Sequence, residues 1–152
     1  MPVPSDKPAS SAWILDPVLE RDTAPLGDLP LCRALLHRDA NYPWLLLVPR
    51  RAGAVEMIDL EPADRVQLMG EIAEASRALK ALTGCDKINV AAIGNAVPQL
   101  HVHIIARFRG DAAWPRPVWN TVPARSYEPD ALEARIAALR RELIRSQAPS
   151  LA

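Results

Sequence analysis

Two histidines, His101 and His103, lie one residue apart in an apolar stretch of a chain that contains only three histidines. In a strand, alternate side chains point to opposite faces, so both imidazoles share one face while Leu100, Val102 and Ile104 line the other. Packing accounts for a single core histidine more readily than for such a pair. Near neutral pH, imidazoles act as nucleophiles, general bases or metal ligands. The sequence therefore predicts that one face of this strand is core and that the other carries chemistry.

An α+β fold is predicted to position this strand. Pro62 suits the first turn of a helix, and Gly84 suits a left-handed cap at its end. Short connections between successive strands favour a mainly antiparallel sheet of about five strands, with the long helix packed on one face. The expected elements are strands at residues 31–36 and 44–48, a long helix at 62–83, a strand at 87–93, the histidine strand, and a C-terminal helix that begins at Pro129.

Apolar spacing predicts which helix faces are buried. The expected stripe of the long helix comprises Val66, Met69, Ile72 or Ala73, Ser76, Leu79 and Leu82. The stripe of the C-terminal helix comprises Leu132, Ile136, Leu139 and Leu143. This second stripe needs a partner surface and is compatible with the pairing of two subunits. Residues 19–30 contain turn formers and predict at most a short edge strand.

Length and composition indicate one domain, since the chain has 152 residues of which 49% are hydrophobic. The 18 basic and 18 acidic residues cancel, which disfavours bulk binding to nucleic acid. Cys32 and Cys85 lack a paired spacing and are expected to be buried in a reducing compartment. Residues 44–48, the longest apolar run, are too short for a membrane span, and residues 1–11 lack the apolar core of a signal peptide. We therefore expect a cytoplasmic protein without membrane contact.

The chain divides into three parts. Residues 1–11 are rich in Pro and Ser and predict a flexible N-terminal segment. Residues 12–110 contain the predicted sheet and long helix and form the main domain. Residues 111–152 combine a Pro- and Trp-rich segment, whose prolines exclude regular helix or interior strand, with the C-terminal helix packed on the domain.

Residues 94–105 resemble the signature of the histidine triad (HIT) superfamily of nucleotidyl hydrolases and transferases, in which three histidines alternate with apolar residues. Gln99 stands at the first histidine position, and a glutamine-first version is also found in the superfamily. His101 and His103 match the second and third positions. The resemblance covers roughly residues 37–108 and implies a HIT-like fold. Within the tail, residues 111–119 are similar to a bacterial branch of the superfamily described as dinucleoside polyphosphate hydrolase-like.

The resemblance implies that His101 attacks the α-phosphorus of a nucleotide, such as a dinucleoside polyphosphate or a nucleoside phosphoramidate. Water would then resolve the nucleotidyl-histidine intermediate. An imidazole attacks only when it is neutral, with one nitrogen free and the other N–H held by an acceptor. The backbone carbonyl of Gln99 is the expected acceptor. His103 would stabilise the charge that develops on the phosphate oxygens.

Five residues are predicted to bind the substrate. Gln99 adjoins the reacting phosphate. His37 stands where family members carry an asparagine or histidine near the nucleotide, and Asn95 stands where many carry a glutamine. Asn89 is a candidate for the ribose, and Trp119 could stack on a base or reach the site of a neighbouring subunit. The last four have structural alternatives, namely a solvated loop, a turn, an edge-strand position and packing against prolines.

Two other functions stay open. His37, His101 and His103 could together bind Zn²⁺ and generate a nucleophilic water. A nucleotide-binding or sensing protein without turnover is the second alternative, with Gln99 and Ala96 as signs of lost activity. We expect no required cofactor, although a divalent cation such as Mg²⁺ could accompany the substrate. The resemblance also implies a homodimer, which would pair through the long helix and a neighbouring strand.

Overall fold

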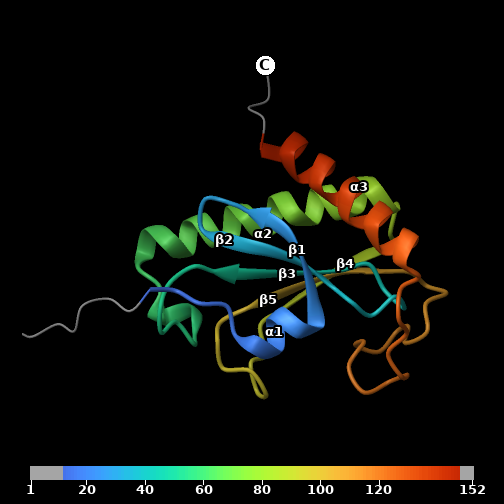
Figure 1. The fold of residues 1–152 in the computed structure, drawn as a ribbon, viewed down its shortest axis with the longest axis horizontal. Coiled ribbons are helices and arrows are strands. Elements are labelled where there is room, and N and C mark those ends of the chain that lie inside the picture. Colours follow the sequence, from blue (N-terminus) through green and yellow to red (C-terminus); the bar gives the residue numbers. More distant parts are fainter. Residues whose placement is uncertain (1–11, 148–152) are drawn as a thin grey trace, which may run out of the picture.

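The computed structural model describes residues 12–147 and has the predicted α+β fold, with a five-stranded sheet (Figure 1). The predicted flexible segment 1–11 lies outside the described residues. All neighbouring strands pair antiparallel, in the order β1-β2-β3-β5-β4. The strands are β1 (Thr23–Asp28), β2 (Cys32–His37), β3 (Trp44–Pro49), β4 (Lys87–Ala91) and β5 (Val102–Arg107). The helices are α1 (Pro17–Asp22), the short 3-10 helix η1 (Met57–Asp59), α2 (Pro62–Thr83) and α3 (Pro129–Gln147).

The long helix α2 has the predicted ends. Pro62 is its first residue, and Gly84 caps it with a φ of 61°. The N–H of Gly84 donates to the carbonyl oxygen of Lys80 at 2.8 Å. Glycine adopts this left-handed conformation more readily than residues with a Cβ, so the cap follows from the residue type.

The buried face of α2 differs from the predicted stripe. Val66 and Met69 are 75% and 66% exposed. The residues that α2 buries are Leu68, Glu71, Ile72, Ala75, Ala78 and Leu79. The small alanines allow the helix to approach the sheet closely, and the buried Glu71 carboxylate accepts hydrogen bonds from two backbone N–H groups at the start of β2, at 2.6 and 2.9 Å. The prediction of an apolar stripe was wrong at Val66 and Met69. Apolar spacing does not detect that the buried face of α2 includes the Glu71 carboxylate.

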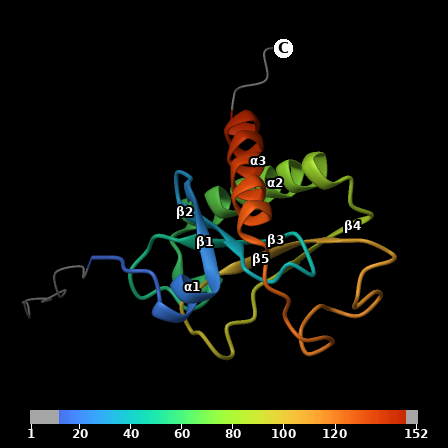
Figure 2. The same cartoon turned by 45° about the vertical axis from the view of Figure 1, so that its right-hand side comes forward.

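The C-terminal helix α3 crosses α2 on the same face of the sheet (Figures 1 and 2). Its stripe belongs to the core of its own chain, with Leu139 and Leu143 buried. Arg140 adds hydrogen bonds of 3.0 Å to the carbonyl oxygens of Pro25 and Leu26 in β1. The stripe therefore has its partner within the chain, and its buried residues are not available to pair two subunits. Within the described residues, no helix has the combined length and hydropathy of a bilayer span.

Residues 17–22, which overlap the predicted turn region 19–30, form a helix that the sequence did not predict. Asp16 caps α1, since its side chain accepts a hydrogen bond of 2.8 Å from the N–H of Val18. Pro17 occupies the first turn, where its missing N–H costs nothing. With six residues, α1 is too short to show helical periodicity. The edge strand predicted for this region is β1, whose register shifts between Pro25 and Gly27.

Candidate active site

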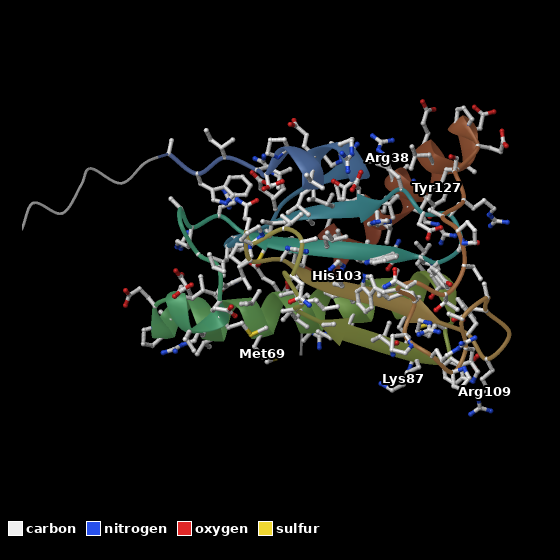
Figure 3. The ribbon with its side chains drawn as sticks, turned by 90° about the horizontal axis from the view of Figure 1, so that it is seen from below. Arg38, Met69, Lys87, His103, Arg109 and Tyr127 are labelled. Atoms are coloured by element: carbon white, nitrogen blue, oxygen red, sulfur yellow. The ribbon has the colours of Figure 1, made fainter. Side chains whose placement is uncertain are left out.

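A cavity of about 450 Å³ lies on the face of the sheet opposite α2 and α3. It lies between α1, the sheet, the loop that joins β4 to β5, and the segment after β5. Figure 3 looks onto this face and shows His103 near the middle of the sheet. The lining residues are Val18, Leu19, Asp22, Thr23, His37, Leu46, Ile93, Gly94, Asn95, Ala96, Val97, His101, His103, Trp119 and Asn120. Five of the seven predicted site residues therefore meet around one cavity.

His101 has one ring nitrogen in a hydrogen bond, and the other has no hydrogen-bond partner among the described residues. Its Nδ1 lies 2.7 Å from the backbone carbonyl oxygen of Gln99. A carbonyl oxygen can only accept, so Nδ1 carries the proton and Nε2 of the neutral ring has a free electron pair. The side chain is 7% exposed. This geometry supplies the acceptor and the free nitrogen that nucleophilic attack by an imidazole requires.

His103 lies beside His101, with ring centroids 4.9 Å apart. Its Nδ1 accepts a hydrogen bond of 2.9 Å from the indole N–H of Trp44. Burial, together with the neighbouring His101 and His37, lowers the pKa of His103 to about 3. His103 is therefore a neutral imidazole at physiological pH.

His37 is packed rather than solvated. Its ring stacks on Trp44 with a centroid distance of 4.1 Å and an interplanar angle of 12°. Its Nδ1 accepts a hydrogen bond of 3.1 Å from the N–H of Asp39. Burial lowers the pKa of His37, while Asp39 and Asp22 oppose that shift. The solvated-loop alternative therefore does not describe His37, which lies in the wall of the cavity.

Trp119 reaches the site from the segment that follows β5. Its ring meets His103 edge to face at a centroid distance of 5.0 Å and Trp44 at 5.7 Å. Asn95, by contrast, lies in the loop before β5, next to Gly94, whose φ is 68°. Both residues line the cavity, so loops outside the sheet contribute to its wall.

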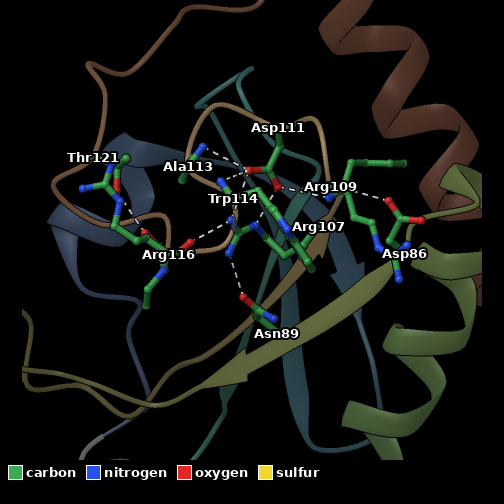
Figure 4. Close-up of polar contacts among 11 residues, drawn as sticks. Asp86, Asn89, Arg107, Arg109, Asp111, Ala113, Trp114, Arg116 and Thr121 are labelled. Carbon is green, nitrogen blue, oxygen red and sulfur yellow. Dashed lines mark hydrogen bonds and ion pairs between the residues drawn. The ribbon is translucent and has the colours of Figure 1, made fainter.

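A buried ion pair holds the segment that carries Trp119 (Figure 4). Arg107, at the end of β5, is 1% exposed and donates to both carboxylate oxygens of Asp111 at 2.8 and 3.1 Å. It also donates to the carbonyl oxygen of Arg116 at 2.8 Å. Burial opposes ionisation of Asp111, but Arg107 and three backbone N–H groups outweigh it and lower the pKa of Asp111 to about 2. The sequence pattern does not predict this network, because a charged residue at the end of a strand is usually exposed to solvent.

Two of the predicted substrate-binding side chains are engaged elsewhere. Asn89 accepts a hydrogen bond of 2.9 Å from Arg107 and does not line the cavity. Gln99 accepts from the N–H of Asp16 at 2.8 Å and donates to the carbonyl oxygen of Ile14 at 2.9 Å. Asn89 therefore lies away from the cavity, and the Gln99 side chain bonds to protein groups, while its backbone carbonyl contacts His101 as expected. Through these two hydrogen bonds, the Gln99 side-chain amide holds the segment before α1 beside the histidine strand.

The geometry does not favour the alternative zinc site formed by His37, His101 and His103. His37 and His103 lie on either side of Trp44, which stacks on the first and donates to the second. His101 has its Nδ1 engaged by a carbonyl oxygen. In the part of the chain that the structure describes, no group of three His, Cys, Asp or Glu side chains is placed to hold a metal ion.

Comparisons with known proteins identify the class to which this fold and site belong. Residues 18–110 match the HIT domain family, and the chain belongs to this family. A histidine triad protein from Bradyrhizobium japonicum is 57% identical, with a TM-score of 0.86 over 88% of this chain and 99% of the other. A comparison with curated proteins gives no match.

Two further solved structures are similar. A histidine triad protein from Sinorhizobium meliloti is 42% identical, with a TM-score of 0.83 over 86% of this chain and 96% of that one. One from Marinobacter aquaeolei is 40% identical, with a TM-score of 0.86 over 89% of this chain and 98% of that one. Each of the three relatives is covered over nearly its whole length.

Proposed function

We propose that the protein is a nucleotide hydrolase or nucleotidyl transferase that uses His101 as its nucleophile. The family and the fold imply nucleotide binding and are compatible with either reaction. The observation that supports His101 is its bond to the Gln99 carbonyl, which leaves Nε2 as the free nitrogen. In the proposed reaction Nε2 attacks the α-phosphorus, and the bond from phosphorus to the leaving group breaks. Water then attacks the nucleotidyl-histidine and restores the free imidazole.

The walls of the cavity support a nucleotide as the substrate. Val18, Leu19 and Val97 give it an apolar side that suits a base, and Trp119 adds an aromatic surface. His103 and Asn95 supply polar groups near the histidine strand, where the α-phosphate would lie. We propose dinucleoside polyphosphates or nucleoside phosphoramidates as substrates. The tail sequence supports the first, and a divalent cation such as Mg²⁺ could accompany its phosphates.

Mass spectrometry of the intact protein tests the covalent step. The protein is mixed briefly with each substrate class, with and without a chelator, as wild type, as His101→Ala and as Ile104→Val. We expect an acid-labile nucleotidyl adduct in the wild type and in Ile104→Val, which changes only the aliphatic face of β5. The adduct should survive the chelator and be absent in His101→Ala.

Other outcomes would favour the alternatives. Nucleotide binding without any adduct or turnover would support the sensing function and overturn the proposal. Turnover that stops on chelation and that His101→Ala leaves intact would point to metal-assisted hydrolysis. An adduct that persists in His101→Ala would move the nucleophile to another residue.

We also propose that two copies of the chain pair through α2 and β4. β4 is an edge strand, and large apolar side chains are exposed on and near these elements, including Val66, Met69 and Val90. A self-complementary contact of this kind is the commonest way for soluble chains to associate. Sedimentation at micromolar concentration should show a dimer that the pair Val66→Glu and Met69→Glu dissociates. Ile144→Glu, at an equally exposed position on α3, is the matched control, and a monomeric wild type would overturn the proposal.

A cytoplasmic location is proposed on the basis of the cysteines. Cys32 and Cys85 are free and buried, as expected in a reducing compartment. Fractionation of the native host with an antibody to the protein tests this location. Recovery in a compartment outside the cytoplasm would contradict it.

A further inference from the structure

Trp44 is the first residue of the apolar strand β3, and its indole contacts His103 in the candidate active site. Trp44 begins β3, and its backbone pairs with Ile105 of β5. On β5, His103 pairs with Leu46, so Trp44 and His103 are diagonal neighbours across the two strands. This register places the indole N–H 2.9 Å from His103 Nδ1.

The direction of this hydrogen bond is fixed by the residue types. An indole N–H can only donate, so the nitrogen that accepts from it must be unprotonated. A neutral imidazole with an unprotonated Nδ1 carries its proton on Nε2. His101 has the opposite arrangement, because its Nδ1 faces a carbonyl oxygen that can only accept. The two neighbouring histidines are therefore held in opposite tautomers.

The indole is itself held in place by aromatic neighbours. His37 stacks on its face at 4.1 Å, Tyr42 approaches at 6.3 Å with an angle of 68°, and Trp119 approaches at 5.7 Å with an angle of 89°. Trp44 is 5% exposed, so water has little access to compete for its N–H. The titratable groups near His103 are His101 and His37, and both disfavour its protonation. The surroundings thus favour one neutral tautomer.

We infer that Trp44 is a positioning residue, which fixes His103 with its proton on Nε2 so that His103 donates to the substrate and does not compete with His101 as a nucleophile. The catalytic consequence of this inference rests on the proposed function, whereas the tautomer of His103 does not. An Nε2–H of fixed orientation can donate to a phosphate oxygen or to the leaving group. A hydrogen-bond donor whose orientation is fixed before the reaction stabilises developing charge better than one that must reorient.

Nitrogen-detected NMR of the histidine rings tests the tautomer without any substrate. In the wild type at neutral pH, His103 should show a protonated Nε2, an unprotonated Nδ1, and a coupling across the hydrogen bond to the Trp44 indole nitrogen. In Trp44→Phe, which keeps an aromatic ring against His37, we expect the coupling to vanish, the share of Nδ1-protonated and doubly protonated rings to rise, and the pKa of His103 to increase.

Trp13→Phe is the matched control. Trp13 also has a buried indole N–H, but that group has no partner among the described residues, so its loss should leave the His103 spectrum unchanged. If Trp44→Phe fails to fold, the coupling between the Trp44 indole nitrogen and His103 Nδ1 in the wild type still tests the tautomer. A wild-type His103 protonated on Nδ1, or a Trp44→Phe spectrum equal to that of the wild type, would overturn the inference.

Kinetics then separate a positioning role from a structural one. Trp44→Phe should lower kcat by about 10- to 100-fold, the range for residues that orient a reacting group, with little change in KM. A changed tautomer with unchanged kcat would refute the catalytic consequence. If no nucleotidyl adduct forms even in the wild type while the tautomer is as described, the proposed function fails and the role of Trp44 in fixing the tautomer stands.

Discussion

The two faces of the sheet are both buried, yet they are built from different side chains. The face under α2 and α3 is aliphatic, with residues such as Leu36, Leu45 and Ile104. The opposite face combines aromatic rings with buried polar groups, above all His103 and Arg107. An aliphatic face needs only volume and shape. On the polar face each group needs a specific partner, because a buried polar group without one is costly.

The largest effect on stability is expected from the ion pair on the polar face. Arg107→Met leaves the Asp111 carboxylate buried without its main partner and should lower the free energy of unfolding by about 3–5 kcal/mol. Urea denaturation measures this loss. The control is Arg109→Met, two residues along and exposed, which should change it by less than about 0.5 kcal/mol. A loss below about 1 kcal/mol for Arg107→Met would show that this face tolerates substitution like the aliphatic one.

The next effect depends on pH. The pKa of His103 is lowered to about 3 in the folded protein, below its ordinary value of 6.5, so protonation favours the unfolded chain. The contribution of neutral His103 is complete above pH 6.5 and is lost as the pH falls toward 3. Between pH 6.5 and 4.5 this loss should reach roughly 2–3 kcal/mol.

His103→Gln tests that dependence. The variant lacks the titrating imidazole, so its free energy of unfolding should fall less steeply over the same pH interval. Urea denaturation gives the free energy of unfolding of both proteins at pH 6.5 and 4.5. Because only the change between the two pH values is compared, a loss of stability that is the same at both values does not affect the result. Equal slopes in the two proteins would refute the buried, neutral state of His103.

Gln99→Ala should have a smaller effect on stability and a distinct effect on function. It removes two hydrogen bonds to the segment before α1, at a cost of about 1–2 kcal/mol. Because the acceptor for His101 is the backbone carbonyl, the nucleotidyl adduct should still form. Val18 and Leu19 in the wall of the cavity lose their anchor, so KM should rise more than kcat falls. Steady-state kinetics measure both changes. Loss of the nucleotidyl adduct would contradict the role of the Gln99 backbone carbonyl as the acceptor for His101.

The smallest effect is expected on the aliphatic face. Ile104→Val removes one methylene next to His103 in sequence but on the other side of the sheet, and should cost about 0.5–1.5 kcal/mol. Turnover should not change. Urea denaturation and kinetics of the same sample check both statements. A large loss of turnover would show that the two faces are coupled.

The amino-acid sequence by itself determined the α+β class, the ends of α2, and the face of the sheet toward which His101 and His103 point. These features follow from local causes. Pro62 and Gly84 mark helix ends through their backbone preferences. Alternation along a strand fixes the common face of His101 and His103.

Only the tertiary structure decided the partners of the buried polar groups. Trp44 and His103 are 59 positions apart, and Gln99 and Asp16 are 83 apart. Their contacts depend on β3 lying next to β5 and on α1 folding back against the histidine strand. No local pattern encodes such pairings, because residue spacing describes one element and its faces, whereas a hydrogen bond between distant elements depends on the register and packing of the whole sheet.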